Sequence, residues 1–268
     1  MCLALIAIGQ HPLYPLIILS NRDEFYARES APADFWQESP NVFSGKDLVR
    51  HGAWLGVNKD GYFSLLTNYR DPKAFKSSMQ SRGLLVSNYL SDYTNRSPLE
   101  YIKHIEAVSN HYNKFNLIIG NVNDAYYYSN VANTTQKLTT HIYCISNHLL
   151  DTPWYKVEHA KQLFSHWLTY IKTSTNMGRD KIHDSLFNIL SDKTLSPDHL
   201  LPKTGIPVEL EKPLSSIYVD VPQHQYGTYC SSIILFEKNN ISFTEKIFNH
   251  GHFSSIRKTD IELLRPLF

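Results

Sequence analysis

The chain of 268 residues is poor in cysteine and in net charge, and it contains no long apolar run. Its three cysteines are an odd number, lie far apart and form no CxxC pair. This pattern argues against a disulfide framework or a zinc site and favours a reducing compartment. A formal net charge of +1 provides no global field that would attract nucleic acid or an anionic membrane. No stretch approaches about twenty apolar residues, so no membrane span is expected.

Several familiar motifs are also missing. The chain has no Walker loop, no GxGxxG, no GxSxG and no HExxH. The first nineteen residues lack a positive n-region and a small-residue cleavage site, so we expect no signal peptide and a cytoplasmic location. In "NHGHF", His250 and His252 have a spacing that can bind a metal or haem iron on an extended segment. No third ligand is evident, and no metal site is predicted.

The chain contains apolar segments with strand and helix periodicity. Strands come first, helices lie mainly in the middle and strands return at the end, which is typical of a single α+β sandwich domain over residues 1–268. The segment 196–213, with four prolines, is predicted to be irregular. The predicted strands are 2–8, 16–20, 53–57, 62–67, 116–119, 125–129, 141–145, 231–236 and 241–248. The predicted helices are 83–93, 99–112, 154–171 and 181–190.

Cys2 stands directly behind the initiator methionine and at the start of the first predicted strand. Aminopeptidases remove the methionine when the second residue is small, and the new N-terminus would carry an α-amine and a thiol on one residue. Because both groups titrate near neutral pH, the amine can accept the thiol proton and the thiolate can attack a carbonyl. The alternative is that Cys2 is simply a small apolar residue that begins a buried strand.

Polar side chains gather where three predicted strands end. The stretch "LSNRDEF" places Asn21 and Asp23 on one face of a strand and Arg22 and Glu24 on the other. One face would lie beside the thiol, where a carboxylate can hold the ammonium form of the amine and an arginine favours thiolate. Two other apolar strands end in an asparagine, at positions 68 and 147. Each side-chain amide can donate a hydrogen bond to an oxyanion or cap the following segment.

Four stretches together resemble the NRDE family, also called the transport and Golgi organisation 2 family. They are "NRDE", "WLGVNKDGYFSLLTNYR", "ISNHLLDTPWYKV" and "YGTYCSSIIL". That family in turn resembles N-terminal-nucleophile hydrolases of the choloylglycine hydrolase and penicillin V acylase type. The resemblance implies a four-layer αββα sandwich of two antiparallel sheets and amide hydrolysis by an N-terminal cysteine.

The resemblance assigns a role to individual residues of this chain. Cys2 matches the nucleophile, and Asn68 and Asn147 match the two oxyanion asparagines. The hydrolases have an arginine followed by an aspartate three residues later, whereas Arg22 and Asp23 are adjacent here, so Glu24 is a rival for Asp23. Most family members have arginine where this chain has Tyr229, and a phenol supplies no fixed positive charge.

Two functions follow as expectations. The first is an amidohydrolase in which Cys2, Arg22, Asp23, Asn68 and Asn147 form the catalytic set and Asn21, Glu24 and Tyr229 contact the ligand. The second is a carrier without turnover, which holds haem, acyl-coenzyme A or another lipidic small molecule in the same cleft. The family is associated with haem trafficking, lipid handling and Golgi organisation, and fold alone does not decide between the two functions. No cofactor of catalysis is expected.

Overall fold

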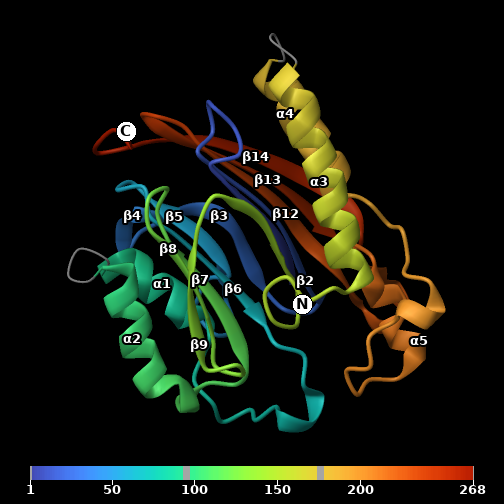
Figure 1. Ribbon diagram of the computed structural model, residues 1–268. Helices are drawn as coiled ribbons and strands as arrows, with labels where there is room; N and C mark the ends of the chain where they lie inside the picture. Colours follow the sequence, from blue (N-terminus) through green and yellow to red (C-terminus); the bar gives the residue numbers. More distant parts are fainter. Residues whose placement is uncertain (1, 93–96, 174–177, 268) are drawn as a thin grey trace.

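Two antiparallel β-sheets lie face to face in the centre of the molecule, with helices outside them (Figure 1). This computed structural model describes residues 2–92, 97–173 and 178–267. The strands of the first sheet are β1 (Cys2–Ile8), β2 (Leu16–Phe25), β10 (His141–Ile145), β11 (Asp220–Val221), β12 (Tyr226–Phe236), β13 (Asn240–Asn249) and β14 (His252–Glu262). The strands of the second are β3 (Ser30–Trp36), β4 (Ser39–Asp47), β5 (Leu55–Asn58), β6 (Phe63–Asn68), β7 (Phe115–Gly120), β8 (Ala125–Ser129) and β9 (Thr134–Leu138).

The strand order of the first sheet is β10-β1-β2-β12-β13-β14, with β11 beside β12, and the second sheet runs from β3 to β9 in chain order. Helices form the two outer layers. They are α1 (Gly83–Asp92), α2 (Pro98–Val108), α3 (Tyr155–Thr173), α4 (Arg179–Leu190) and the short α5 (Val208–Glu211). Helices α3 and α4 pack on the first sheet, and α1 and α2 on the second. The α+β, four-layer αββα sandwich predicted from the sequence is confirmed.

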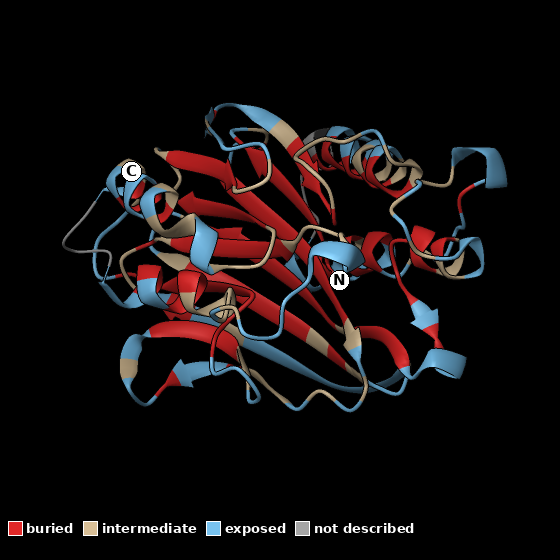
Figure 2. Ribbon diagram, turned by 90° about the horizontal axis from the view of Figure 1, so that it is seen from below, coloured by how far each residue is buried: buried red, intermediate tan, exposed pale blue. Residues whose placement is uncertain are grey.

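Nearly all residues of β1 and β2 are buried, which explains why their apolar runs show no alternation. The strands at the centre of the molecule are mostly buried (red in Figure 2). Ala4, Ile6 and Ile18 contribute to the core between the two sheets. Leu3 and Leu5 face the other way and pack under α3 and α4. The two strands are hydrogen-bonded to each other in the interior of their sheet, as expected.

Local signals explain several element boundaries. Helix α2 begins after Ser97, whose side chain accepts a hydrogen bond from the amide of Glu100, while the Glu100 carboxylate accepts one from the Ser97 amide. The hairpin between β5 and β6 turns at Gly61, which has a φ of 82°. The predicted helix over 99–112 ends earlier, at Val108, and a 3₁₀ turn (Ser109–His111) follows.

Some sequence-based expectations need correction. Strands β3, β4, β9, β11 and β14 were not predicted, and α5 lies in the segment expected to be irregular. β2 extends to Phe25, beyond the predicted end at residue 20, and β12 begins at Tyr226, before the predicted start at residue 231. The "NHGHF" segment is not extended throughout, because a tight turn at His250 and Gly251, with φ values of 50° and 79°, separates Asn249 at the end of β13 from His252 at the start of β14. Tyr93, the predicted last residue of the first helix, lies outside the described residues.

Within the described ranges, no helix is both long and apolar enough to cross a membrane. Nor do these ranges hold a group of three or more histidine, cysteine, aspartate or glutamate side chains that could bind a metal.

Candidate active site

A cleft of about 610 Å³ opens where the polar ends of β1, β2 and β6 meet. Its walls come from these strand ends, from residues 47–54 between β4 and β5, and from the segment between β6 and α1. Four residues of the predicted catalytic set line it, together with Glu24: Cys2, Arg22, Asp23 and Asn68. The αββα sandwich therefore brings together residues that are far apart in the sequence.

Cys2 is the first described residue of the central strand β1, and only 8% of it is exposed. It lies opposite Arg22 in the β1–β2 register, so the two side chains share the face that is directed toward the second sheet. Burial raises the pKa of the Cys2 thiol; the carboxylates of Asp23 and Glu24 add to this rise, and the Arg22 guanidinium opposes it. The thiol is thus placed for contact with a ligand but is not a ready thiolate.

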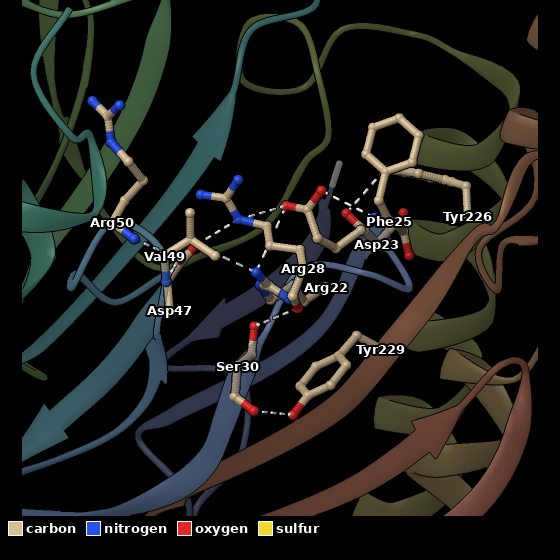
Figure 3. A network of polar contacts seen from close by, with 11 residues as sticks. Arg22, Asp23, Phe25, Arg28, Ser30, Asp47, Val49, Arg50, Tyr226 and Tyr229 are labelled. Carbon is tan, nitrogen blue, oxygen red and sulfur yellow. Dashed lines mark hydrogen bonds and ion pairs between the residues drawn. The ribbon is translucent and has the colours of Figure 1, made fainter. Parts of the chain in front are cut away.

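The Arg22 guanidinium contacts two aromatic rings that meet edge to face, at 4.4 Å from the ring centre of Trp54 and 5.3 Å from that of Tyr229. Its Nη2 is 3.6 Å from a Glu24 oxygen and 3.5 Å from an Asp47 oxygen, and Arg28 donates a 2.7 Å hydrogen bond to Asp47 (Figure 3). The Arg22 side chain is 5% exposed. Its Nη1 is buried without a hydrogen-bond partner in the described part of the chain. A positive charge therefore stands beside Cys2, although position 229 is not arginine.

Tyr229 and Asn21 lie outside the lining of the cleft. The Tyr229 hydroxyl donates a 2.8 Å hydrogen bond to the Ser30 carbonyl (Figure 3), and its ring supports Arg22. Asn21 points to the opposite face of β2, where its amide donates to the carbonyls of Leu190 and Ile217 at 2.8 and 3.0 Å. Both side chains hold neighbouring elements in position.

Asp23 shares the Asn21 face of β2. One of its carboxylate oxygens accepts a 2.8 Å hydrogen bond from the Thr228 hydroxyl, and its backbone carbonyl accepts one of 2.9 Å from Tyr226. Burial raises the pKa of Asp23, and the buried Lys156 ammonium opposes this effect. Of the two rival carboxylates, Glu24 shares the Cys2 face and Asp23 lies under the end of the strand.

The two predicted oxyanion asparagines lie together but differ in exposure. Asn68 lines the cleft, whereas Asn147 is fully buried behind it. The Asn147 amide donates a 2.9 Å hydrogen bond to the Asn68 backbone carbonyl, and the Asn147 carbonyl accepts one of 2.8 Å from the Arg70 amide. Asn147 therefore fixes the end of the strand that carries Asn68.

Sequence reasoning missed a hydrogen-bonded chain beside these asparagines. Thr152 donates its only hydroxyl proton to the Leu149 carbonyl (2.8 Å), so His148 Nδ1 must donate to Thr152 (2.8 Å). His148 Nε2 then accepts the Tyr69 hydroxyl proton at 2.7 Å. Tyr69 lines the cleft, and burial lowers the pKa of His148, which favours this neutral form. Tyr69 and His148 directly follow Asn68 and Asn147, so extending the strand-end signal by one residue would have found them.

The fold and this cleft define a class, an αββα sandwich with a cysteine at the cleft end of a central strand. The chain belongs to the Transport and Golgi organisation 2 family, whose model matches residues 1–250. It is 34% identical to the human Transport and Golgi organization protein 2 homolog and 33% identical to the homolog from Bos taurus, each over 92% of both chains. The Drosophila melanogaster protein is 29% identical over 98% of both chains.

Two solved structures align with most of this chain at low sequence identity. A conjugated bile acid hydrolase from Clostridium perfringens, solved as its C2A mutant, has a TM-score of 0.45 and 11% identity, over 97% of this chain and 92% of that one. A Caenorhabditis elegans ortholog of N-acylethanolamine-hydrolyzing acid amidase also has a TM-score of 0.45, with 9% identity over 87% and 92%.

The buried position of Cys2 leads to a prediction that needs no substrate. We expect its alkylation by iodoacetamide to rise with pH through an inflection above the ordinary cysteine value of about 8.5. Glu24→Gln should lower that inflection, because it removes a carboxylate that disfavours the thiolate. Mass spectrometry of peptides separates Cys2 from the two fully buried cysteines, Cys144 and Cys230. An inflection below the ordinary value, or one that Glu24→Gln raises, contradicts this prediction.

Proposed function

We propose that the protein hydrolyses a carbon–nitrogen bond of a small or lipidic amide, with Cys2 as an N-terminal nucleophile. The observation that supports this most is the position of Cys2, which opens into a cleft beside the Arg22 guanidinium and the Asn68 side chain. A cleft of about 610 Å³ is within the size range of small-molecule sites. The three free cysteines of the described chain fit a reducing, cytoplasmic location.

In the proposed reaction, removal of Met1 makes Cys2 the first residue. Its α-amine accepts the thiol proton, and the thiolate sulfur attacks the amide carbonyl. The carbon–nitrogen bond of the tetrahedral intermediate then breaks, and the amine leaves with the proton. Water hydrolyses the resulting thioester, which releases the acid and restores the thiol. Atoms and charges balance without a cofactor.

The neighbouring residues have distinct roles in this proposal. Arg22 favours the thiolate, because its charge lowers the pKa of Cys2. Asn68 donates a hydrogen bond to the developing oxyanion, and Asn147 acts as a positioning residue through its bond to the Asn68 carbonyl. Asp23 holds the ammonium form of the α-amine.

One observation favours the second function, a carrier of an acyl chain or haem. The Asn147 amide donates a hydrogen bond to a protein carbonyl, so this bond would have to break before the same N–H could contact a substrate oxyanion. The exposed side chains of Phe25 and Phe75 on the lining of the cleft offer apolar contact to a bound molecule. A carrier would bind the acyl compound or haem and leave it chemically unchanged, even though Cys2 is intact.

Two measurements separate these functions. The intact mass of the native protein shows whether Met1 is present. Assays with a panel of acyl amides show whether the protein hydrolyses any of them. Retention of Met1 removes the proposed base and counts against the hydrolase. Binding of haem or an acyl-coenzyme A at micromolar level, without turnover of any amide, supports the carrier.

Within the hydrolase proposal, we expect Asn68→Ala to lower kcat by roughly two to three orders of magnitude, the usual effect of losing one oxyanion donor. KM should change much less, because the donor acts mainly on the charge of the transition state. Asn239→Ala, in an exposed turn, is the matched control and should leave both constants unchanged. Equal activity of the two variants would remove Asn68 from the proposed site.

A further inference from the structure

Most charged groups around the cleft are already paired. Arg22 and Arg28 face the carboxylates of Glu24 and Asp47. Outside this group, Arg70 forms an ion pair with Glu211, and Lys114 forms one with Asp71. These pairs account for the acidic side chains on the second-sheet side of the cleft.

Three cations that line the same cleft, Arg50, Lys76 and Arg82, form none of the ion pairs found in the described residues. Arg50 donates a 2.6 Å hydrogen bond to the Met79 carbonyl, and Arg82 donates one of 2.8 Å to the Lys114 carbonyl. A guanidinium has five N–H donors, so each retains donors for a ligand. The Arg50 side chain points away from the Arg22–Asp47 network (Figure 3).

Arg82 is the most informative of the three because it is partly buried. Burial lowers the pKa of Arg82 to about 10; Glu24 opposes this effect, and the like charges of Arg28 and Arg50 add to it. The positive charge of Arg50 is therefore close enough to disfavour the charged form of Arg82. A guanidinium that is taken out of water beside like charges is stabilised by an anion that enters the site.

Helix α1 adds to this positive field. It begins at Gly83, which lines the cleft, and its first turn holds no acidic residue. The Gly83 carbonyl accepts a 3.1 Å hydrogen bond from the Ala53 amide. A Cβ on Gly52 would lie 2.3 Å from the Gly83 carbonyl carbon, so the two glycines allow a close approach that fixes the start of the helix. The positive end of the helix dipole therefore has a defined place beside Arg82.

We propose that Arg50, Lys76, Arg82 and the start of α1 form a subsite for an anionic group, a phosphate or a carboxylate, of the molecule that enters the cleft. The proposal rests on the proposed function only in assuming that this cleft receives the ligand. It narrows the ligand to an anionic compound whose reactive or apolar part extends toward Cys2. Two adjacent guanidiniums favour the planar, bidentate contacts that both kinds of anion accept.

Calorimetric titration with tail-free anions tests the subsite. Pyrophosphate and glutarate are the probes. Tighter binding of pyrophosphate indicates a subsite for phosphate, and tighter binding of glutarate indicates one for carboxylate. We expect a dissociation constant below about 1 mM for at least one of them at low salt. Arg50→Gln and Arg82→Gln should each weaken binding about tenfold or more, because each removes charge-assisted hydrogen bonds. Arg179→Gln, whose exposed guanidinium has carboxylate partners elsewhere, should bind like the wild type.

Several outcomes would overturn the subsite. One such outcome is that neither probe gives a heat of binding up to about 10 mM. Another is that the wild type and both subsite variants bind the probes with equal affinity. Arg82 also bonds to the Lys114 carbonyl, so thermal unfolding of each variant is measured first. If Arg82→Gln does not fold, the exposed Arg50 carries the test alone. Pyrophosphate and glutarate contain no amide, so a failure of hydrolysis leaves this result unaffected.

Discussion

Cys2→Ala is expected to abolish amide hydrolysis while the protein remains folded. The substitution removes the only atom that attacks the carbonyl in the proposed reaction, so turnover should fall below detection. Only a sulfur atom is lost from the end of a strand whose remaining six residues are buried and apolar. The free energy of unfolding should therefore change by no more than about 1 kcal/mol. Activity assays and urea denaturation of the same preparation measure the two effects.

Two companion variants make this result specific. Cys2→Ser should retain only a trace of activity, because a hydroxyl is far less acidic than a thiol. Cys144→Ala removes a fully buried cysteine of β10, away from the cleft lining, and should leave kcat unchanged. Full activity of Cys2→Ala would rule out the hydrolase proposal, and it would leave the carrier function standing.

The central strands were predictable because their sequences carry a strong physical signal. Both faces of β1 and of the first part of β2 are covered, so Leu3–Ile8 and Leu16–Leu19 are all apolar. β2 continues beyond its predicted end at Ser20 through the polar residues 20–24 to Phe25. The same logic located Cys2, Arg22 and Asn68 at strand ends, and the αββα order brings these ends to one cleft. Their catalytic roles stay a prediction.

The strands that escaped prediction lie mainly at sheet edges. β14 exposes nearly all of its residues, and β9 buries only Leu138, so neither shows the apolar alternation that marks a half-buried strand. β3 is also an edge strand, with register shifts in its pairing to β4. Backbone pairing to a neighbouring strand stabilises such segments, and the sequence of the segment itself does not reveal that neighbour.

The features of the candidate site that could not be predicted from the sequence are contacts between elements that are distant in the chain. The sequence does not show that Asn147 would bond to the Asn68 carbonyl, or that Tyr229 would stack on Arg22. Nor does it distinguish Arg28, which forms an ion pair with Asp47, from Arg82, which donates a hydrogen bond to the Lys114 carbonyl. Each distinction depends on which side chains the two sheets and the segment 69–82 bring within a few ångströms.

The buried ion pair between Arg70 and Glu211 is one of these distant contacts, and its removal is expected to cause a large loss of stability. Arg70 Nη1 is 2.6 Å from a Glu211 oxygen, and the two side chains are only 7% and 2% exposed. The other Glu211 oxygen accepts hydrogen bonds from the Thr204 amide, at 3.1 Å, and from its hydroxyl. The pair thus connects the segment after β6 to the short helix α5.

We expect Arg70→Ala to lower the free energy of unfolding by about 3–5 kcal/mol, because it leaves the Glu211 carboxylate buried without its cation. The double variant Arg70→Met, Glu211→Leu should lose less than Arg70→Ala alone, since it removes both charges and keeps most of the volume. Lys114→Ala, which breaks a more exposed pair with Asp71, is the matched control and should cost at most about 1 kcal/mol. Urea denaturation measures all three. A loss of under about 1 kcal/mol for Arg70→Ala would mean that water or another cation reaches Glu211, and that this pair does not anchor the wall of the cleft.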